Sequence, residues 1–208
     1  MAVDTTHTVL ALDIGGTKIS AAIVDARGRV LARARAATPK EGGDALTRPV
    51  LDLAAGITAD APSPPSGVGV SVAGAVEADG GTIAFAPNLP GLDGVPLGDL
   101  LSERLGIPAC VVYDGHAGAL GEHWRGAGRG ARGMAFLIVG TGIGGGLILD
   151  GRLRRGARGI AGAAGWMVVD PEATSSPEVG ALGSLEAAAA GPGLAAEARR
   201  SGLGDAAT

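Results

Sequence analysis

Residues 11–25 read ALDIGGTKISAAIVD, two apolar segments joined by a short glycine-containing turn. Residues 8–14 and 19–25 each have the length and the apolar, β-branched composition of a strand, and residues 29–36 predict a third. The joining segments, GGTK and ARG, are too short for a crossover connection, so we expect the three strands to pair as an antiparallel meander. The first turn of this meander would expose several backbone N–H groups.

The rest of the chain alternates strands and helices and then changes character. A Gly- and Arg-rich segment at 125–133 follows a β–α–β pattern, and beyond it come a β-hairpin and an Ala-rich helix. We therefore expect an α/β chain with two lobes, residues 1–124 and 125–208, of which the second has too little sheet to match the first. The elements predicted after the meander are a helix at 42–59, strands at 67–76 and 82–85, a helix at 97–105, a strand at 109–113, a helix opened by Asp114, a hairpin of 134–140 and 146–153, and a helix at 184–200 broken at 191–193.

Composition excludes several classes of protein. The chain has 208 residues, of which 46% are hydrophobic and 38 are glycine without a collagen-like period, so neither a disordered chain nor a collagen rod fits. A net charge of −4 disfavours nucleic acid and anionic membrane as partners. The single cysteine, Cys110, rules out an intrachain disulfide and a multi-cysteine zinc site.

Targeting signals are also missing from the sequence pattern. The longest charge-free run, residues 134–149, contains five glycines and is shorter than a membrane span. The segment MAVDTTHTVLALD at residues 1–13 lacks the basic start of a secretory signal. We therefore expect a cytoplasmic protein without a membrane partner.

The first glycine turn is a candidate phosphate-binding site. Gly15 and Gly16 let the backbone approach a phosphate closely, and Thr17 and Lys18 can donate hydrogen bonds to its oxygens. Asp13, at the end of the preceding strand, can hold Mg²⁺ through water. The same residues would also suit an ordinary Gly-Gly hairpin turn, and this pattern alone does not decide between the two.

A second glycine-rich turn spans Gly140 to Gly146. Residues 140–145 spell G-x-G-x-x-G after a predicted strand, but a dinucleotide site needs a helix next, and here another strand follows. The Rossmann interpretation therefore fails. A glycine turn between antiparallel strands is still suited to bind an anion, and a flexible hairpin loop is the alternative.

Three further polar residues stand where chemistry can occur. Asp114 follows an apolar strand and opens a helix, so it can accept a proton from a substrate hydroxyl or cap the helix, and the two roles are compatible. Asn88 lies between two prolines in APNLPG, where its amide suits a pair of sugar hydroxyls or a plain turn. Residues 69–73, GVSVA, narrowly miss the G-x-S-x-G elbow of serine hydrolases, but they continue as an apolar strand, so Ser71 is interpreted as a strand residue.

In their order and spacing, these segments resemble the ROK family of sugar kinases and sugar-responsive repressors. ALDIGGTKISAAIVD is similar to the family's first phosphate loop, APNLPGL to its sugar-binding loop, YDGHAGALGEHWRGAGRG to the segment with its catalytic Asp, and FLIVGTGIGGGLILDGRLRRGARGIAG to its second phosphate hairpin. The resemblance implies the actin-like ATPase (ribonuclease H-like) fold. It also implies ATP and Mg²⁺ as cofactors and a hexose as substrate.

Carried onto this chain, the resemblance implies a role for each matching residue. Asp114 would take the proton from the hydroxyl that is phosphorylated, and Asn88 and Glu186 (in GSLEAAAAG) would bind the sugar with it. The phosphate clamp would consist of Asp13, Gly15, Gly16, Thr17 and Lys18 on one side and Thr141, Gly142 and Gly144 on the other. Mg²⁺ would arrive with the nucleotide, with Asp13 contacting it through water.

The chain departs from the family's pattern at several positions. Tyr113 stands where the family usually has Asn, and Ala163 and Trp166 stand where it has the sugar-binding Glu and the zinc-binding His of Glu-x-Gly-His. Residues 171–184, PEATSSPEVGALGS, contain no Cys or His, and a tetrahedral zinc site needs about four such ligands, so we expect no structural zinc. The family also continues past the position of Thr208 with a glycine-rich motif that packs against adenosine, so we expect a half-built nucleotide site.

The sequence thus predicts ATP-dependent phosphorylation of a glucose-like hexose, with Asp114 as general base. The alternative is a catalytically silent or truncated member that senses a sugar or a nucleotide, in keeping with the side chains missing at 163 and 166. Direct DNA binding is disfavoured, because the few residues before the first strand are too short for a helix-turn-helix. The sequence leaves open which sugar is bound and whether a homodimer forms.

Overall fold

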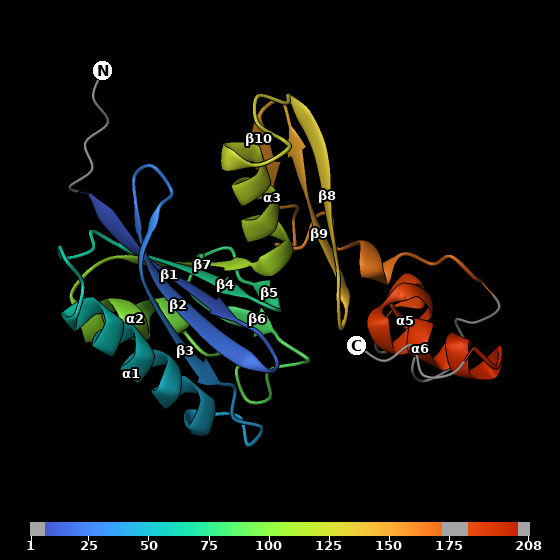
Figure 1. Cartoon of the computed structure of the whole chain (residues 1–208), viewed down its shortest axis with the longest axis horizontal. Coiled ribbons are helices and arrows are strands. Elements are labelled where there is room, and N and C mark those ends of the chain that lie inside the picture. Colours follow the sequence, from blue (N-terminus) through green and yellow to red (C-terminus); the bar gives the residue numbers. More distant parts are fainter. Residues whose placement is uncertain (1–6, 172–182, 204–208) are drawn as a thin grey trace. The chain divides into compact units, whose positions relative to one another are not determined.

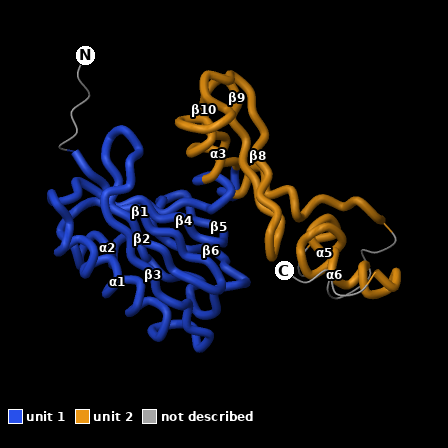
Figure 2. The backbone as a smooth tube through the Cα atoms, viewed as in Figure 1, with its two compact units in different colours: residues 1–117, 157–159 blue, residues 118–156, 160–208 orange. Residues whose placement is uncertain are grey.

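The computed structural model describes residues 7–171 and 183–203, which form two compact units (Figure 2). Unit 1 consists of residues 1–117 and 157–159, and unit 2 of residues 118–156 and 160–208. The boundary falls inside helix α3 (Asp114–Arg125), a few residues before the predicted lobe boundary at residue 124. The short return of residues 157–159 to unit 1 has a packing reason, since a side chain at Gly159 would overlap the Val76 carbonyl.

A five-stranded sheet is the centre of unit 1. Its strands are β1 (Thr8–Ile14), β2 (Lys18–Asp25), β3 (Val30–Ala37), β4 (Val68–Val72) and β7 (Ala109–Tyr113), in the order β3-β2-β1-β4-β7. The pairs β1–β2 and β2–β3 are antiparallel, which confirms the predicted meander. The pairs β1–β4 and β4–β7 are parallel, so β1, β4 and β7 end at the same edge of the sheet.

Two helices, α1 (Asp44–Ala59) and α2 (Leu97–Leu105), cover one face of this sheet (Figure 1). Alternate residues of β1, namely Leu10, Leu12 and Ile14, are buried with the apolar stripe of α1, which the 3.6-residue spacing predicted. The opposite face of β1 carries Val9, Ala11 and Asp13, which are exposed or half-buried. The sheet is therefore apolar toward the helices and more open on the face that bears Asp13.

The prediction of one strand at residues 67–76 is wrong, because this segment forms two strands. β4 ends at Val72, and β5 (Ala75–Val76) pairs instead with β6 (Ile83–Phe85) in a separate two-stranded sheet. The chain turns between them at Gly74, where a Cβ would lie 2.6 Å from the Phe85 carbonyl oxygen. An unbroken apolar run does not reveal such a turn, because its residues suit either sheet.

Unit 2 has a three-stranded antiparallel sheet and short helices. The strands β8 (Gly133–Val139), β9 (Ile143–Leu149) and β10 (Arg152–Arg154) lie in the order β10-β9-β8, and α3 packs Gly118 against the Phe136 ring of β8. A 3₁₀ turn η1 (Ala164–Trp166) precedes α5 (Ser184–Ala189) and α6 (Gly191–Arg200). The predicted helix break at 191–193 lies at Ala190 instead, because Pro192 is in the first turn of α6, where proline is tolerated. In the part of the chain that the structure describes, no helix has the length and apolar character to cross a membrane.

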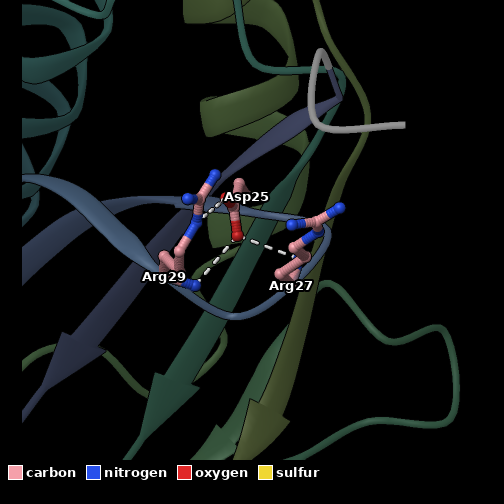
Figure 3. Close-up of polar contacts among 3 residues, drawn as sticks. All are labelled: Asp25, Arg27 and Arg29. Carbon is pink, nitrogen blue, oxygen red and sulfur yellow. Dashed lines mark hydrogen bonds and ion pairs between the residues drawn. The ribbon is translucent and has the colours of Figure 1, made fainter. Parts of the chain in front are cut away.

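A buried carboxylate, Asp25, closes the turn between β2 and β3 (Figure 3). Its Oδ1 accepts the backbone N–H groups of Arg27 and Arg29, both at 2.9 Å, and its Oδ2 lies 2.6 Å from Nε of Arg29. Burial would raise the pKa of Asp25, but the Arg29 and Arg27 hydrogen bonds and the Arg29 charge together hold that pKa below its ordinary value.

Replacing this carboxylate should destabilise the chain at neutral pH. A lowered pKa in the folded state contributes stability above about pH 4, where the unfolded carboxyl is ionised, and this contribution disappears as the pH falls through the folded-state pKa. We expect Asp25→Asn to lower the free energy of unfolding at neutral pH, measured by urea denaturation. The difference from wild type should shrink progressively in acid.

The matched control is Asp60→Asn, which alters an exposed carboxyl at the end of α1. It should change the free energy of unfolding by less than Asp25→Asn at every pH. Equal effects of the two variants at neutral pH would contradict the role given to Asp25.

Candidate functional site

The first glycine hairpin joins β1 to β2 and is fixed from both sides. The N–H of Gly15 donates to the Lys18 carbonyl at 3.0 Å, and the hydroxyl of Thr38 donates to the Gly15 carbonyl at 2.6 Å. The N–H of Thr38 also donates to the Thr17 carbonyl at 3.2 Å. Thr38 is buried and was not singled out from the sequence, although the β2–β3 pairing, which sets Lys18 opposite Ala37, places it beside the turn.

Asp13 lies on the open face of the sheet, next to the hairpin. It pairs in register with Ser71 of β4, whose hydroxyl donates to its Oδ1 at 3.2 Å. Both residues line a hollow of about 410 Å³, together with Arg33 and Arg35 of β3. These two arginines were not predicted as site residues, although their alternation in RVLARARA indicates that they share one face of a strand. Ser71 stays within β4, so no nucleophile elbow forms there.

The structure brings the predicted sugar loop against the first hairpin. A Cβ at Gly16 would lie 3.2 Å from the Asn88 carbonyl oxygen and 3.5 Å from the Asn88 Cβ. Two hydrogen bonds hold the loop in shape, since Ala86 N–H donates to Asp93 at 2.8 Å and Gly43 N–H donates to the Pro90 carbonyl at 3.0 Å. Asn88 is therefore an exposed residue on a fixed loop beside a glycine turn.

Asp114 lies at the same edge of the sheet as Asp13. Asp13 of β1 is opposite Ser71 of β4, and Ser71 is opposite Val112 of β7. Asp114 comes two residues after Val112 in the chain. Neighbouring strands are about 4.8 Å apart, which separates the two strand ends by about 10 Å. The Asp114 Oδ1 accepts the N–H of Gly115 at 2.7 Å, so its carboxylate is fixed at the start of α3.

Tyr113, which directly precedes Asp114, is a core residue. It is buried at the end of β7, and its ring meets that of His116 edge-on, with centroids 5.2 Å apart and an interplanar angle of 78°. The residue that replaces the family's usual Asn therefore packs into the interior, where an aromatic pair of this geometry is favourable.

The second glycine hairpin joins β8 to β9, and a strand follows it as predicted. The N–H of Gly140 donates to the Gly142 carbonyl at 2.9 Å and closes the turn. The segment of α5 and α6 supports the tip, because the N–H of Ile143 donates to Glu186 Oε2 at 2.6 Å and the N–H of Gly191 donates to the Gly140 carbonyl at 2.8 Å. Thr141, Gly142 and Gly144 thus share one hairpin, and Glu186 contacts it.

Ala163 and Trp166, the two residues that depart from the family's Glu-x-Gly-His pattern, lie close to this hairpin. The intervening Gly165 contacts the Ile143 carbonyl, and the Leu185 N–H donates to the Met167 carbonyl at 3.0 Å. The Trp166 side chain is 50% exposed. The expected absence of zinc falls mainly on residues 172–182, which lie outside the described residues, so it stays a prediction. Within residues 7–171 and 183–203, no group of three or more His, Cys, Asp or Glu side chains could hold a metal ion.

The predicted site residues therefore fall into two groups. Unit 1 brings together the first hairpin, Asn88 and Asp114 around one edge of its sheet. Unit 2 brings together the second hairpin and Glu186.

The strand order of unit 1 defines the class of protein. An antiparallel meander that continues into parallel strands, with a glycine hairpin and a carboxylate at the strand ends, is typical of the actin-like ATPase fold of the similar structures. Residues 9–206 match the sequence model described as the ROK family, and the chain belongs to this family.

Several similar proteins of the family are sugar kinases. The chain is 35% identical over 190 residues to a glucokinase of Halalkalibacterium halodurans, covering 89% of this chain and 57% of that protein. It is 37% identical to an N-acetylmannosamine kinase of Salmonella newport, covering 92% of this chain and 64% of that protein. A crystal structure of a ROK family glucokinase from Streptomyces griseus in complex with glucose and AMPPNP matches with a TM-score of 0.81 and 34% identity, over 95% of this chain and 62% of that one. The chain thus spans less than two thirds of the length of each of these relatives.

Because Gly16 lies against Asn88, an alanine substitution at Gly16 should affect stability differently from one at Gly56. A methyl group at Gly16 must push the Asn88 main chain by a few tenths of an ångström, whereas Gly56 of α1 has open space at its Cβ position. We expect Gly16→Ala to lower the free energy of unfolding by about 1 kcal/mol. Gly56→Ala should leave it unchanged or raise it by about 0.5 kcal/mol, because alanine is the better helix former. Urea denaturation measures both, and a Gly16→Ala variant as stable as Gly56→Ala would contradict the contact.

Proposed function

We propose that this chain forms the core of an ATP-dependent kinase that phosphorylates a hydroxyl of a glucose-like hexose, with Asp114 as the general base. The observation that carries the proposal is the grouping in unit 1. Gly16 of a phosphate-type hairpin contacts the Asn88 loop, and Asp114 ends the parallel strand two places from β1. Phosphoryl transfer to a sugar needs these three parts: donors for phosphate oxygens, a ligand for the sugar and an acceptor for a proton.

The reaction exchanges one bond for another. The sugar hydroxyl oxygen forms a bond to the γ-phosphorus of ATP, the bond from that phosphorus to its bridging oxygen breaks, and ADP leaves with the bridging oxygen. The hydroxyl proton passes to the carboxylate of Asp114 during the attack. The 2.7 Å hydrogen bond from Gly115 N–H holds that carboxylate in a fixed orientation, which supports its use as a base.

The hydrogen bonds within each hairpin narrow the choice of phosphate donors. The N–H of Gly15 is used to close the first turn, so Gly16, Thr17 and the Lys18 side chain are the groups proposed to bind phosphate there. In the second hairpin the N–H of Gly140 already donates to the Gly142 carbonyl, and the N–H of Ile143 already donates to Glu186. Thr141 and Gly142 at the tip, with Gly144 beside them, are the corresponding groups in unit 2.

Asp13 is suited to a Mg²⁺ ion that arrives with the nucleotide. Mg²⁺ prefers hard oxygen ligands and is commonly held through one or two carboxylates, water and phosphate oxygens. The carboxylate of Asp13, which accepts the Ser71 hydroxyl at 3.2 Å, is proposed to contact the ion through water. When bound, the ion supplies charge neutralisation on the phosphate oxygens. Asp13 orients it, and no cage of protein ligands is required.

The substrate class comes from the relatives. They include glucokinases and an N-acetylmannosamine kinase, so a hexose is proposed, with Asn88 and Asp114 as its ligands in unit 1. A small-molecule kinase acts where ATP is supplied, and the proposal therefore includes a cytoplasmic location.

A second candidate function is sugar or nucleotide binding without turnover. Ala163 offers only a methyl group, and Trp166 has a half-exposed indole where the family's pattern has polar sugar and zinc ligands. A lost hydrogen bond to a buried polar group costs about 1–3 kcal/mol, so the absence of the sugar-binding Glu would weaken sugar binding by about one to two orders of magnitude. This candidate predicts binding of AMPPNP or glucose with no phosphorylated product.

The test of the kinase proposal is Asp114→Asn in a coupled assay of ADP release and sugar phosphorylation, with glucose, mannose and N-acetylmannosamine. Asparagine keeps the shape of the side chain but cannot accept the proton. We expect kcat to fall by about 10²- to 10⁴-fold while the affinity for AMPPNP, measured by calorimetry, stays the same.

The matched control is Asp99→Asn, which changes an exposed carboxyl on α2 and should leave kcat unchanged. Equal turnover of Asp114→Asn and wild type would remove the base assignment. A folded wild-type chain that binds glucose but phosphorylates none of the sugars would favour the second candidate.

A further inference from the structure

Glu186 has a contact that its predicted role in sugar binding does not explain. Its Oε2 accepts the N–H of Ile143, the first residue of β9, at 2.6 Å. The two residues are 43 positions apart, and a hydrogen bond to a carboxylate is shorter and stronger than one between neutral groups. This contact ties helix α5 directly to the end of the second glycine hairpin.

Two glycines lie directly against this carboxylate. A Cβ at Gly142 would lie 2.7 Å from Glu186 Oε2, and a Cβ at Gly165 would lie 2.9 Å from the same atom. Glycine at both positions therefore lets the carboxylate reach the hairpin. The side chain is held between the hairpin tip and the segment that contains η1.

A second contact from the same helical segment holds the other end of the turn. The N–H of Gly191 donates to the Gly140 carbonyl at 2.8 Å, and a Cβ at Gly191 would lie 3.1 Å from that oxygen. The turn is thus fastened at Gly140 and at Ile143, with Thr141 and Gly142 between the two points. A glycine-rich turn has a large conformational entropy, and two fixed ends remove much of it before a ligand arrives.

We propose that Glu186 is a positioning residue that holds the tip of the second glycine hairpin in one conformation by accepting the Ile143 N–H, and that this contact raises the affinity of the hairpin for a nucleotide. This inference rests on the proposed phosphate-binding role of the hairpin for its effect on the nucleotide. The fastening of the tip itself does not depend on that role.

The first readout is amide hydrogen exchange of the 208-residue chain without ligand, followed by mass spectrometry. In Glu186→Ala, we expect peptides that cover residues 140–146 to exchange about 10- to 100-fold faster than in wild type, because the acceptor of the Ile143 N–H is gone. Glu186→Gln keeps an acceptor oxygen of the same reach and should stay within about threefold of wild type. Peptides from β1 report whether the fold of unit 1 is intact in each variant.

A substitution on the hairpin itself gives an independent test of the same contact. The methyl group of Gly142→Ala would displace the Glu186 carboxylate, so this variant should exchange as fast as Glu186→Ala at residues 140–146. The double variant should be no faster than either single one, because both remove one interaction. Glu197→Gln, on the exposed part of α6, is the matched control and should exchange as wild type does.

The second readout is nucleotide binding, measured in the absence of sugar. Calorimetry should show AMPPNP affinity reduced by about 10-fold in Glu186→Ala and restored in Glu186→Gln. Unchanged exchange at 140–146 in Glu186→Ala would overturn the inference, as would AMPPNP binding by that variant as tight as that of wild type. If wild type failed to bind AMPPNP, the proposed function would fail, while the exchange data would still decide whether Glu186 fastens the hairpin.

Discussion

Close approach of main chain to its neighbours is the constraint on which both glycine hairpins depend. At Gly16 a side chain would press on the Asn88 loop, and at Gly142 it would meet the carboxylate of Glu186. The same constraint applies to Gly165 and Gly183. A Cβ at Gly165 would overlap the Ile143 carbonyl oxygen of the second hairpin, and a Cβ at Gly183 would overlap the Gly165 carbonyl oxygen. Packing therefore requires glycine at these positions, independently of any role in phosphate binding.

Close approach alone would leave each tip free to move, and polar side chains from distant segments supply the missing order. Thr38 donates to the Gly15 carbonyl of the first hairpin, and Glu186 accepts the Ile143 N–H of the second. Thr38 acts as a donor and Glu186 as an acceptor, and each satisfies one main-chain group of its hairpin. The groups that remain at the tips are those for which phosphate binding is proposed.

Much of the fold follows from local patterns, and the exceptions have a common cause. The meander was predictable because the joins are too short for anything else, and α1 because its apolar stripe has helical spacing. The split of residues 67–76 and the helix break at Ala190 were not predicted, because both depend on which neighbours the chain meets. In the site, the family pattern pointed to the hairpins, Asn88 and Asp114. It did not point to Thr38, whose partner lies 23 positions away.

The sequence by itself determined the meander, the order of strands and helices, and the family to which the chain belongs, because these depend on spacing along the chain and on runs of a few residues. Only the tertiary structure decided that Asn88 lies against Gly16, that Ser71 donates to Asp13 and that Glu186 holds Ile143. The physical reason is range. A hydrogen bond or a van der Waals contact acts over a few ångströms, and residues dozens of positions apart come within that range only after the sheets and helices have packed.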